Sequence, residues 1–259
     1  MAGLRPALLR GLAASGSLLG AVALWAAATA RGTVSPFLLP GPPAVLERLW
    51  DDLVAGDLVA ALGQTLGAAL SGFTIAAVVG TALGIAMVRI PVVRWFFDPL
   101  VSLGFPMPKI AFLPIFMLWL GPSTAAKVII VAVSCVFPVI AAAVAGAEGV
   151  DKTMLWSARS LGASRLALLW EVSLPAAIPQ ILTGFQVALP VALITTIVAE
   201  MLMGSDGLGG AMLQAMRFAD SPGVFAGILA IGVLGFGLIR GMEALRGRLL
   251  RWHAEGGRG

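Results

Sequence analysis

Residues 58–88 read LVAALGQTLGAALSGFTIAAVVGTALGIAMV, a run without Asp, Glu, Lys or Arg between Asp57 and Arg89. A helix needs about 20 apolar residues to cross about 30 Å of hydrocarbon. Lipid offers no water to backbone N–H and C=O groups, so a segment that spans it must pair them internally, as a helix does. This run therefore predicts an all-α membrane protein.

Five further runs also lack charged residues, and a span tolerates as few as about 17 residues. They lie between Arg10 and Arg31, Lys109 and Lys127, Lys127 and Glu148, Glu171 and Glu200, and Asp220 and Arg240. Transmembrane strands would instead alternate over segments of about ten residues, and no such pattern is visible. We expect a polytopic protein with about six transmembrane helices, over residues 11–30, 64–88, 110–126, 128–147, 177–200 and 223–240.

Composition supports the same class. Hydrophobic residues make up 59% of the chain and charged residues 12%, and the mean hydropathy is +0.98. A soluble domain carries about 25% charged residues, so too little polar surface is available to cover a soluble globule. The net charge of +4 does not indicate a nucleic-acid partner, because the basic residues are scattered among short loops instead of forming one face.

Six spans place both termini on one side of the membrane. If that side is the cytoplasm, most Lys and Arg residues lie inside, and only Arg31, Arg48, Lys127 and Arg217 lie outside. The positive-inside rule therefore predicts an N-in, C-in topology in a bacterial cytoplasmic membrane. The first run follows two arginines, as a cleaved signal peptide does, but it is longer than a usual signal core and five spans follow it. An uncleaved first helix is the preferred interpretation.

The largest external segment is 31–63. Apolar residues recur in it at helical spacing after Pro42-Pro43, which is a tolerated helix start, at Val45, Leu46, Leu49, Trp50 and Leu53. Two interpretations stay open: an amphipathic helix at the outer membrane interface, or a helix packed against the bundle.

The other sizeable polar segment is cytoplasmic, residues 148–175. Met154, Leu155 and Leu161 fall on one face of a short predicted helix, which Gly162 would end in a left-handed conformation. Ser164 is placed to cap a second short helix, and Pro175 would close it before the fifth span. Two short helices with an apolar edge indicate a docking surface, although a loop packed on its own bundle would look the same.

That segment resembles the cytoplasmic loop of binding-protein-dependent ABC importer permeases, whose pattern is Glu-Ala-Ala, three residues, Gly, nine residues and Ile-x-Leu-Pro. Further blocks resemble the nitrate, sulfonate and taurine branch of that family, in the same order along residues 35–240. These blocks are Phe105–Pro114, Leu118–Gly121, Leu161–Arg165, Leu174–Pro179, Gly184, Ala199–Met201 and Gly207–Gly209.

The resemblance implies the type I ABC importer permease fold, as one domain over residues 1–259 with its core at about 64–245. It also implies that the loop inserts into a cytoplasmic ATPase. The residues at the family's positions are Trp156, Ser157, Ala158, Leu161, Gly162, Val172, Leu174 and Pro175. Trp156 and Ser157 replace the family's Glu-Ala, so the contact of that acid cannot be assigned here. The implied partners are a second, identical permease copy, an ATPase dimer and an external solute-binding protein.

A solute path through lipid needs polar groups that face a cavity. Hydroxyls in membrane helices more often bond their own backbone or a neighbouring helix, so each candidate is open to that interpretation. Glu200 ends a long apolar run and is open to an interfacial structural role as well. The candidates are Gln64, Thr65, Ser134, Gln186, Thr195, Thr196 and Glu200.

The chain lacks the G-x-x-x-x-G-K-[ST] phosphate loop and any catalytic or metal-ligand cluster, and its lone Cys135 forms no internal disulfide. We expect a permease subunit without a cofactor, not an enzyme, that moves a small solute inward by alternating access. The resemblance favours a sulfonate, taurine or nitrate, and a thiamine precursor or other heterocycle is the alternative. An ion-gradient transporter would show inverted repeats and intramembrane ionisable residues, which we do not find, and a membrane enzyme would need clustered catalytic residues.

Overall fold

The computed structural model describes residues 4–32 and 34–251, and within these ranges it is helical with no strand. Most elements are α-helices, η1 is a 3₁₀ helix and η2 is a π-helix. The bounds are α1 Leu4–Ala30, α2 Pro42–Ala55, α3 Asp57–Arg89, α4 Pro91–Gly104, η1 Lys109–Phe112, α5 Leu113–Leu120, α6 Thr124–Glu148, α7 Lys152–Ser160, α8 Arg165–Ala167, η2 Leu168–Ser173, α9 Leu174–Met203, α10 Leu208–Arg217 and α11 Ser221–Leu249.

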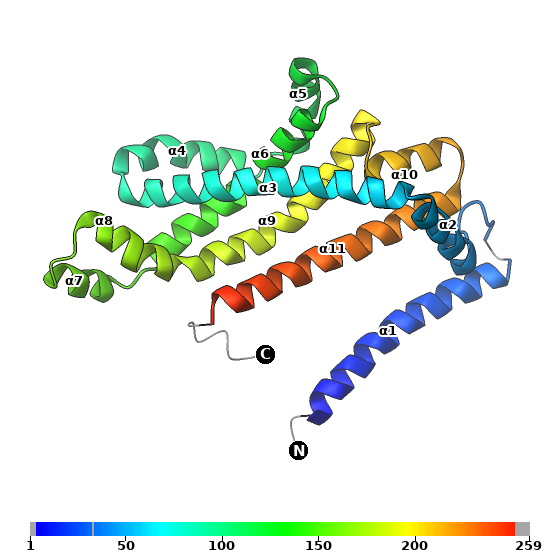
Figure 1. The fold of residues 1–259 in the computed structure, drawn as a ribbon, viewed down its shortest axis with the longest axis horizontal. Coiled ribbons are helices and arrows are strands. Elements are labelled where there is room, and N and C mark those ends of the chain that lie inside the picture. Colours follow the sequence, from blue (N-terminus) through cyan, green and yellow to red (C-terminus); the bar gives the residue numbers. More distant parts are fainter. Residues whose placement is uncertain (1–3, 33, 252–259) are drawn as a thin grey trace.

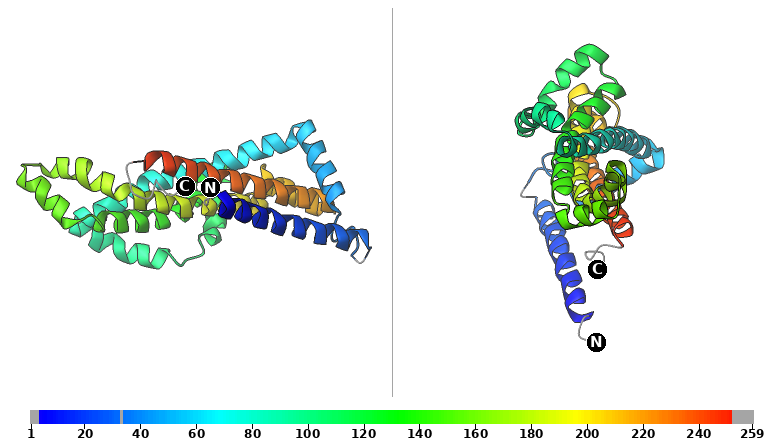
Figure 2. Two further views of the ribbon diagram at one scale, coloured as in Figure 1. Left: turned by 90° about the horizontal axis from the view of Figure 1, so that it is seen from below. Right: turned by 90° about the vertical axis from the view of Figure 1, so that its left-hand side faces the viewer.

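The long helices α3, α6, α9 and α11 run along the length of an elongated bundle (Figure 1). Short helices lie at its two ends, with α7 and α8 at one end and α2 and α10 at the other (Figures 1 and 2), and α5 projects from its side (Figure 1). Helix α1 lies beside the bundle and packs lightly on α2. The arrangement therefore separates two candidate functional ends by the full length of the long helices.

Four described helices are long and apolar enough to cross a membrane: α3, the continuous η2–α9 segment Leu168–Met203, α6 and α11. The pair α4 and η1–α5 passes the same test together, with a bend of 96° between its halves, and is a fifth candidate. In α1 the segment Leu19–Ala30 is apolar but shorter. Five of the six expected spans thus coincide with helices.

The expected span 110–126 is wrong. A helix covers only Leu113–Leu120 in this region, and the chain breaks before α6 begins at Thr124. Gly121 has a positive φ of 68°, and Ser123 caps α6 by accepting a hydrogen bond from the Ala126 N–H at 3.4 Å. The other half of this broken span is α4, which the charge pattern missed because Arg94 and Asp98 interrupt it.

Small residues hold the centre of the bundle together. A Cβ atom at Gly72 would lie 2.6 Å from Val131 Cβ, and one at Gly84 would lie 2.6 Å from Ala143 Cβ. These glycines let α3 and α6 approach closely, and Gly184 does the same for α9 against Ala142 of α6. Close contact of this kind supplies the packing energy of membrane helices, for which burial from water gives no driving force.

Within residues 31–63, α2 begins at Pro42 as expected, and Gly56 ends it with a φ of 88°. Val45 is fully buried against the bundle, where α2 packs on α11 and α3. Leu46 and Trp50 on the same helix are 58% and 64% exposed. One edge of α2 therefore packs on the bundle, as the second interpretation predicts, and a position of the exposed edge at the membrane interface stays a prediction.

Candidate functional site

The segment after α6 folds into a hairpin of short helices. Asp151 caps α7 by accepting a hydrogen bond from the Thr153 N–H at 2.8 Å, and the side-chain and backbone hydrogen bonds from Thr153 lower the pKa of its carboxyl. Gly162 ends α7 with a φ of 86°, in the left-handed region that only glycine enters without strain. Ser164 then accepts a hydrogen bond from the Ala167 N–H at 3.1 Å and caps α8.

The hairpin presents large apolar side chains to solvent at the end of the molecule. Leu161 at its tip is 88% exposed, and Trp156 and Ser157 beside it are also exposed. Leu166 and Trp170 on the second arm are 67% and 61% exposed. Such an apolar edge on a projecting element is costly in water, which indicates that another surface covers it.

The base of the hairpin is less exposed than its tip, since Ala158, Val172, Leu174 and Pro175 are partly buried. The sequence predicted that Pro175 would end the second short helix before the fifth span. The structure shows that this prediction is wrong. Pro175 lies in the first turn of α9, and η2 runs into α9 without a break. Because Pro175 has no N–H to donate, one helical hydrogen bond is missing where the π-helix passes into α9.

Two side-chain contacts tie this end of the bundle together. The Arg89 guanidinium at the end of α3 donates a hydrogen bond to the Ser173 hydroxyl at the η2–α9 junction. Ser173 in turn donates to the Leu168 carbonyl oxygen at 3.0 Å and is buried. Arg94 of α4 forms an ion pair with Glu148 at the end of α6. The hairpin is thus attached to the bundle through α3 and α9.

At the opposite end, Glu200 and Thr65 form a buried polar cluster. Both are 0% exposed, and the Thr65 hydroxyl donates to Glu200 Oε2 at 2.9 Å. Lys127 Nζ lies 3.7 Å from Glu200 Oε1 and donates to the Asp206 carbonyl oxygen at 3.2 Å. Sequence reasoning missed Lys127, which it assigned to an outside segment. The sequence signal that could have identified Lys127 is its position as a lone charged residue between two apolar runs.

The loop after Glu200 is shaped around its carboxylate. The Gly209 N–H in the first turn of α10 donates to Glu200 Oε2 at 3.1 Å, and the Leu208 N–H donates to the Thr65 hydroxyl at 2.9 Å. A helix N-terminus favours a negative charge in this position. A Cβ atom at Gly207 would collide with the Glu200 carboxylate. The family's blocks Ala199–Met201 and Gly207–Gly209 are therefore parts of one buried cluster around the Glu200 carboxylate.

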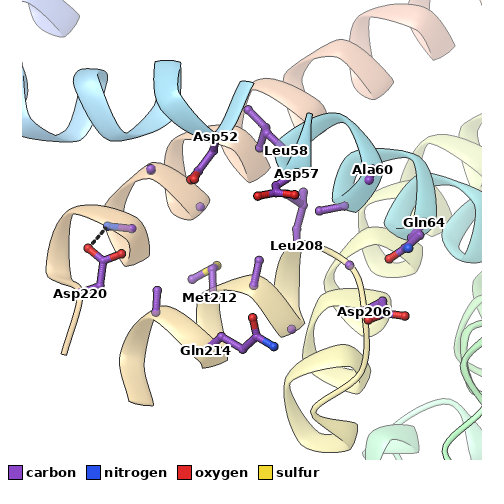
Figure 3. Close-up of a pocket in the computed structure, with 18 of the residues that line it drawn as sticks. Asp52, Asp57, Leu58, Ala60, Gln64, Asp206, Leu208, Met212, Gln214 and Asp220 are labelled. Carbon is purple, nitrogen blue, oxygen red and sulfur yellow. Dashed lines mark hydrogen bonds between the residues drawn. The ribbon is translucent and has the colours of Figure 1, made fainter. Parts of the chain in front are cut away.

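A cavity of about 450 Å³ opens next to this cluster, between α2, α3, α10 and α11 (Figure 3). Acidic and amide side chains line it, including Asp52, Asp57 and Gln64 in the close-up. Arg48 Nη1 bridges one side to Asp220 Oδ2 at 3.4 Å. Of the predicted path residues, Gln64 is in this cavity.

The remaining path candidates divide between two environments. Ser134 and Thr195 line a separate groove between α6 and α9. Thr196 is fully buried and donates to the Ala192 carbonyl oxygen of its own helix at 2.8 Å, and Gln186 Oε1 accepts from Arg246 Nη1 of α11 at 2.6 Å. The structure therefore brings together two pairs of the seven candidates, Thr65 with Glu200 and Ser134 with Thr195.

Comparison with known proteins identifies the class. Residues 76–251 match the family described as "Binding-protein-dependent transport system inner membrane component". The chain belongs to this family, and it is a multi-pass membrane permease subunit of an ABC importer. Proteins of this family work with an ATPase and a substrate-binding protein.

Curated relatives cover most of the chain. The taurine transport system permease protein of Escherichia coli strain K12 is 37% identical over 89% of this chain and 86% of the relative. The putative aliphatic sulfonates transport permease protein of the same strain is 30% identical, over 90% of this chain and 89% of the relative. The formylaminopyrimidine transport permease protein of Halalkalibacterium halodurans is 31% identical, over 88% of this chain and 90% of the relative.

Solved structures share the fold. The inward-facing MetNI methionine ABC transporter matches with a TM-score of 0.60 and 15% identity, over 74% of this chain and 98% of the matched one. An amino acid ABC transporter solved with histidines matches with a TM-score of 0.59 and 18% identity, over 78% and 97% of the two chains. The predicted type I importer permease fold is therefore confirmed.

Proposed function

We propose that this chain carries a small sulfonate such as taurine into the cytoplasm, driven by ATP that a separate ATPase subunit hydrolyses. The observation that supports it most directly is the exposed hairpin of α7, α8 and η2, whose tip residue Leu161 is 88% exposed. An apolar tip on a projecting hairpin suits insertion into a cleft on a partner, and the family supplies a partner of the required kind.

The topology follows from the same assignment. If the hairpin meets a cytoplasmic ATPase, the end of the bundle that carries it is the inner one, and α2 and α10 are at the outer end (Figure 1). Both termini then lie inside. The cavity of about 450 Å³ and the loop 204–207 face the external solute-binding protein.

The connection between hairpin and bundle suggests how ATP hydrolysis drives transport. Helix α9 continues η2 without a break and reaches Glu200 at the outer end. A displacement of the hairpin by the ATPase would therefore be passed to α9, which packs along α6 and α3. Two identical copies that move in this way around a shared path would produce alternating access.

The substrate class comes from the relatives. Taurine and aliphatic sulfonate permeases at 37% and 30% identity favour a sulfonate. A formylaminopyrimidine permease at 31% identity supports a heterocycle as the second candidate. The external binding protein selects the solute in such a system, so uptake assays must include it.

The test is co-purification of the ATPase from native membranes in mild detergent, followed by ATP-dependent taurine uptake in proteoliposomes. The Leu161→Glu variant places a charge at the tip of the hairpin and should lose most of the ATPase. Met216→Glu is the matched control, because Met216 is 57% exposed on α10 at the opposite end. It should retain the ATPase. Equal ATPase recovery with both variants would contradict the docking role of the hairpin.

A further inference from the structure

A groove of about 380 Å³ lies between the α4–η1 break, α6 and α9. Apolar side chains form most of its wall, including Val187 and Val191 of α9. Three polar side chains also line it: Lys109, Ser134 and Thr195. Its size is near the lower end of small-molecule sites, which measure about 300–1,000 Å³.

Lys109 lies partway along the bundle, and its side chain is partly exposed. Its Nζ is 4.9 Å from the centroid of the Phe137 ring, and Phe137 is near the middle of the 25-residue helix α6. At 1.5 Å per residue, α6 is ~37 Å long and its middle falls near the bilayer midplane. The charge pattern assigned Lys109 to a cytoplasmic segment, whereas its contact with Phe137 favours a position within the membrane. An ionisable side chain at this depth is costly and marks a functional site by default.

The charge of Lys109 has no counter-ion within the described chain. None of the ion pairs among residues 4–32 and 34–251 includes it. Its Nζ donates to the Phe105 carbonyl oxygen at 2.6 Å and lies over the rings of Phe105 and Phe137. An ammonium has three donors, so two are available for another acceptor.

The comparison with Lys127 is informative. Lys127 is buried in the bundle. It is 4% exposed, and its Nζ lies 3.7 Å from the carboxylate of its partner Glu200. Lys109 instead lines an open groove and has aromatic rings where Lys127 has a carboxylate. Aromatic faces stabilise a cation without neutralising it. Lys109 therefore remains able to attract an anion.

Thr195 adds a second donor to the same groove. It is 9% exposed, and its hydroxyl donates to no other group of the described chain. The Ser134 hydroxyl, in contrast, donates to the Ile130 carbonyl oxygen at 2.8 Å, as helical serines commonly do. The groove thus combines an ammonium and a free hydroxyl with an apolar wall.

We propose that Lys109 binds the anionic sulfonate group of the solute during passage, with Thr195 as an additional donor and the valines of α9 against its aliphatic part. This inference rests on the proposed function and assigns its anion-binding residue. The expected ligand is a small organic oxyanion, whose charged oxygens accept hydrogen bonds from the Lys109 ammonium. Such a pair is stronger in a site of low dielectric constant than in water.

The experiment uses the complete purified complex of permease, ATPase and binding protein. The variants are Lys109→Gln and Lys109→Arg, and Arg248→Gln at the exposed end of α11 is the control. Uptake of taurine and ethanesulfonate should fall at least tenfold in Lys109→Gln, and remain within about threefold of the parent protein in Lys109→Arg and Arg248→Gln. ATPase recovery should be unchanged in all three.

A binding measurement without transport separates recognition from folding. In detergent, without the binding protein, millimolar ethanesulfonate should raise the unfolding temperature of the parent permease–ATPase complex, and the uncharged ethanesulfonamide should not, because ligand that binds the native state stabilises it. The shift should be absent in Lys109→Gln. That variant should unfold no earlier than the parent protein without ligand, because it removes an unpaired charge from the bundle.

The outcomes distinguish the inference from the proposed function. If the parent complex transports sulfonates and Lys109→Gln transports them equally well, the role of Lys109 is wrong and the proposed function stands. If the parent complex transports no sulfonate, both fail. An equal shift with ethanesulfonamide would also contradict anion recognition by Lys109.

Discussion

Lys127 Nζ lies 3.7 Å from Glu200 Oε1, and the two side chains are 4% and 0% exposed. The pair joins the N-terminal part of α6 to the C-terminal part of α9, and Thr65 of α3 donates to the same carboxylate. Three long helices are therefore fastened at one point, and the first turn of α10 closes over it. Because the pair is buried, removing one partner leaves an uncompensated charge.

We predict that Glu200→Ala lowers the stability of the permease by about 3 kcal/mol or more, the usual cost of breaking a buried ion pair from one side. The double variant Lys127→Met/Glu200→Gln should be less destabilised than Glu200→Ala. Thermal unfolding of purified protein in detergent, followed by tryptophan fluorescence, measures both. A double variant at least as destabilised as Glu200→Ala would contradict the predicted ion pair.

The packing of α3 on α6 gives a second prediction. A Cβ atom at Gly84 would meet Ala143 Cβ at 2.6 Å, so Gly84→Ala should destabilise the bundle by about 1–3 kcal/mol through overpacking. Gly67 on the same helix has nothing within 4 Å of such an atom. Gly67→Ala should therefore be neutral or slightly stabilising. Similar unfolding temperatures for the two variants would contradict the predicted contact.

Substitutions at Gly162 test the effect of backbone conformation, because an added side chain meets no neighbouring atoms there. The φ of Gly162 is 86°, and a Cβ atom there would meet nothing within 4 Å. Asn enters the left-handed region more readily than β-branched residues do. Gly162→Asn should therefore keep most of the ATPase in co-purification, and Gly162→Val should lose it. If Val is tolerated as well as Asn, the tight turn is not needed for docking.

The lone native cysteine makes a labelling test of topology simple. Cys135 is 0% exposed, so a membrane-impermeant maleimide should not reach it. In intact spheroplasts we expect Met216→Cys to be labelled and Leu161→Cys to be labelled only after the membrane is opened. Labelling of Leu161→Cys from outside would place the hairpin away from any cytoplasmic ATPase, and the importer assignment of this segment would be wrong.

Charge spacing was enough to predict four helices that are long and apolar enough to cross a membrane, because a charge-free run long enough to cross lipid has few alternatives to a helix. The same rule failed for the third span. Arg94 and Asp98 lie within α4, and the chain turns by 96° before η1–α5 continues. A span that breaks partway cannot be recognised from an uninterrupted apolar run.

The hairpin was also predictable, since Asp151, Gly162 and Ser164 act on backbone groups within a few residues of themselves. Pro175 was misjudged, because proline stops a helix or starts one according to the conformation of the residues before it. Here a π-helix carries the chain into α9.

The sequence by itself determined the class of protein: an apolar chain of spanning helices with a capped hairpin and the family's blocks in order. Only the tertiary structure paired Glu200 with Lys127 and placed Lys109 beside Phe137. The reason is physical. Propensity, capping and apolar length act along the chain, whereas the partner of a buried charge is set by which helices pack together.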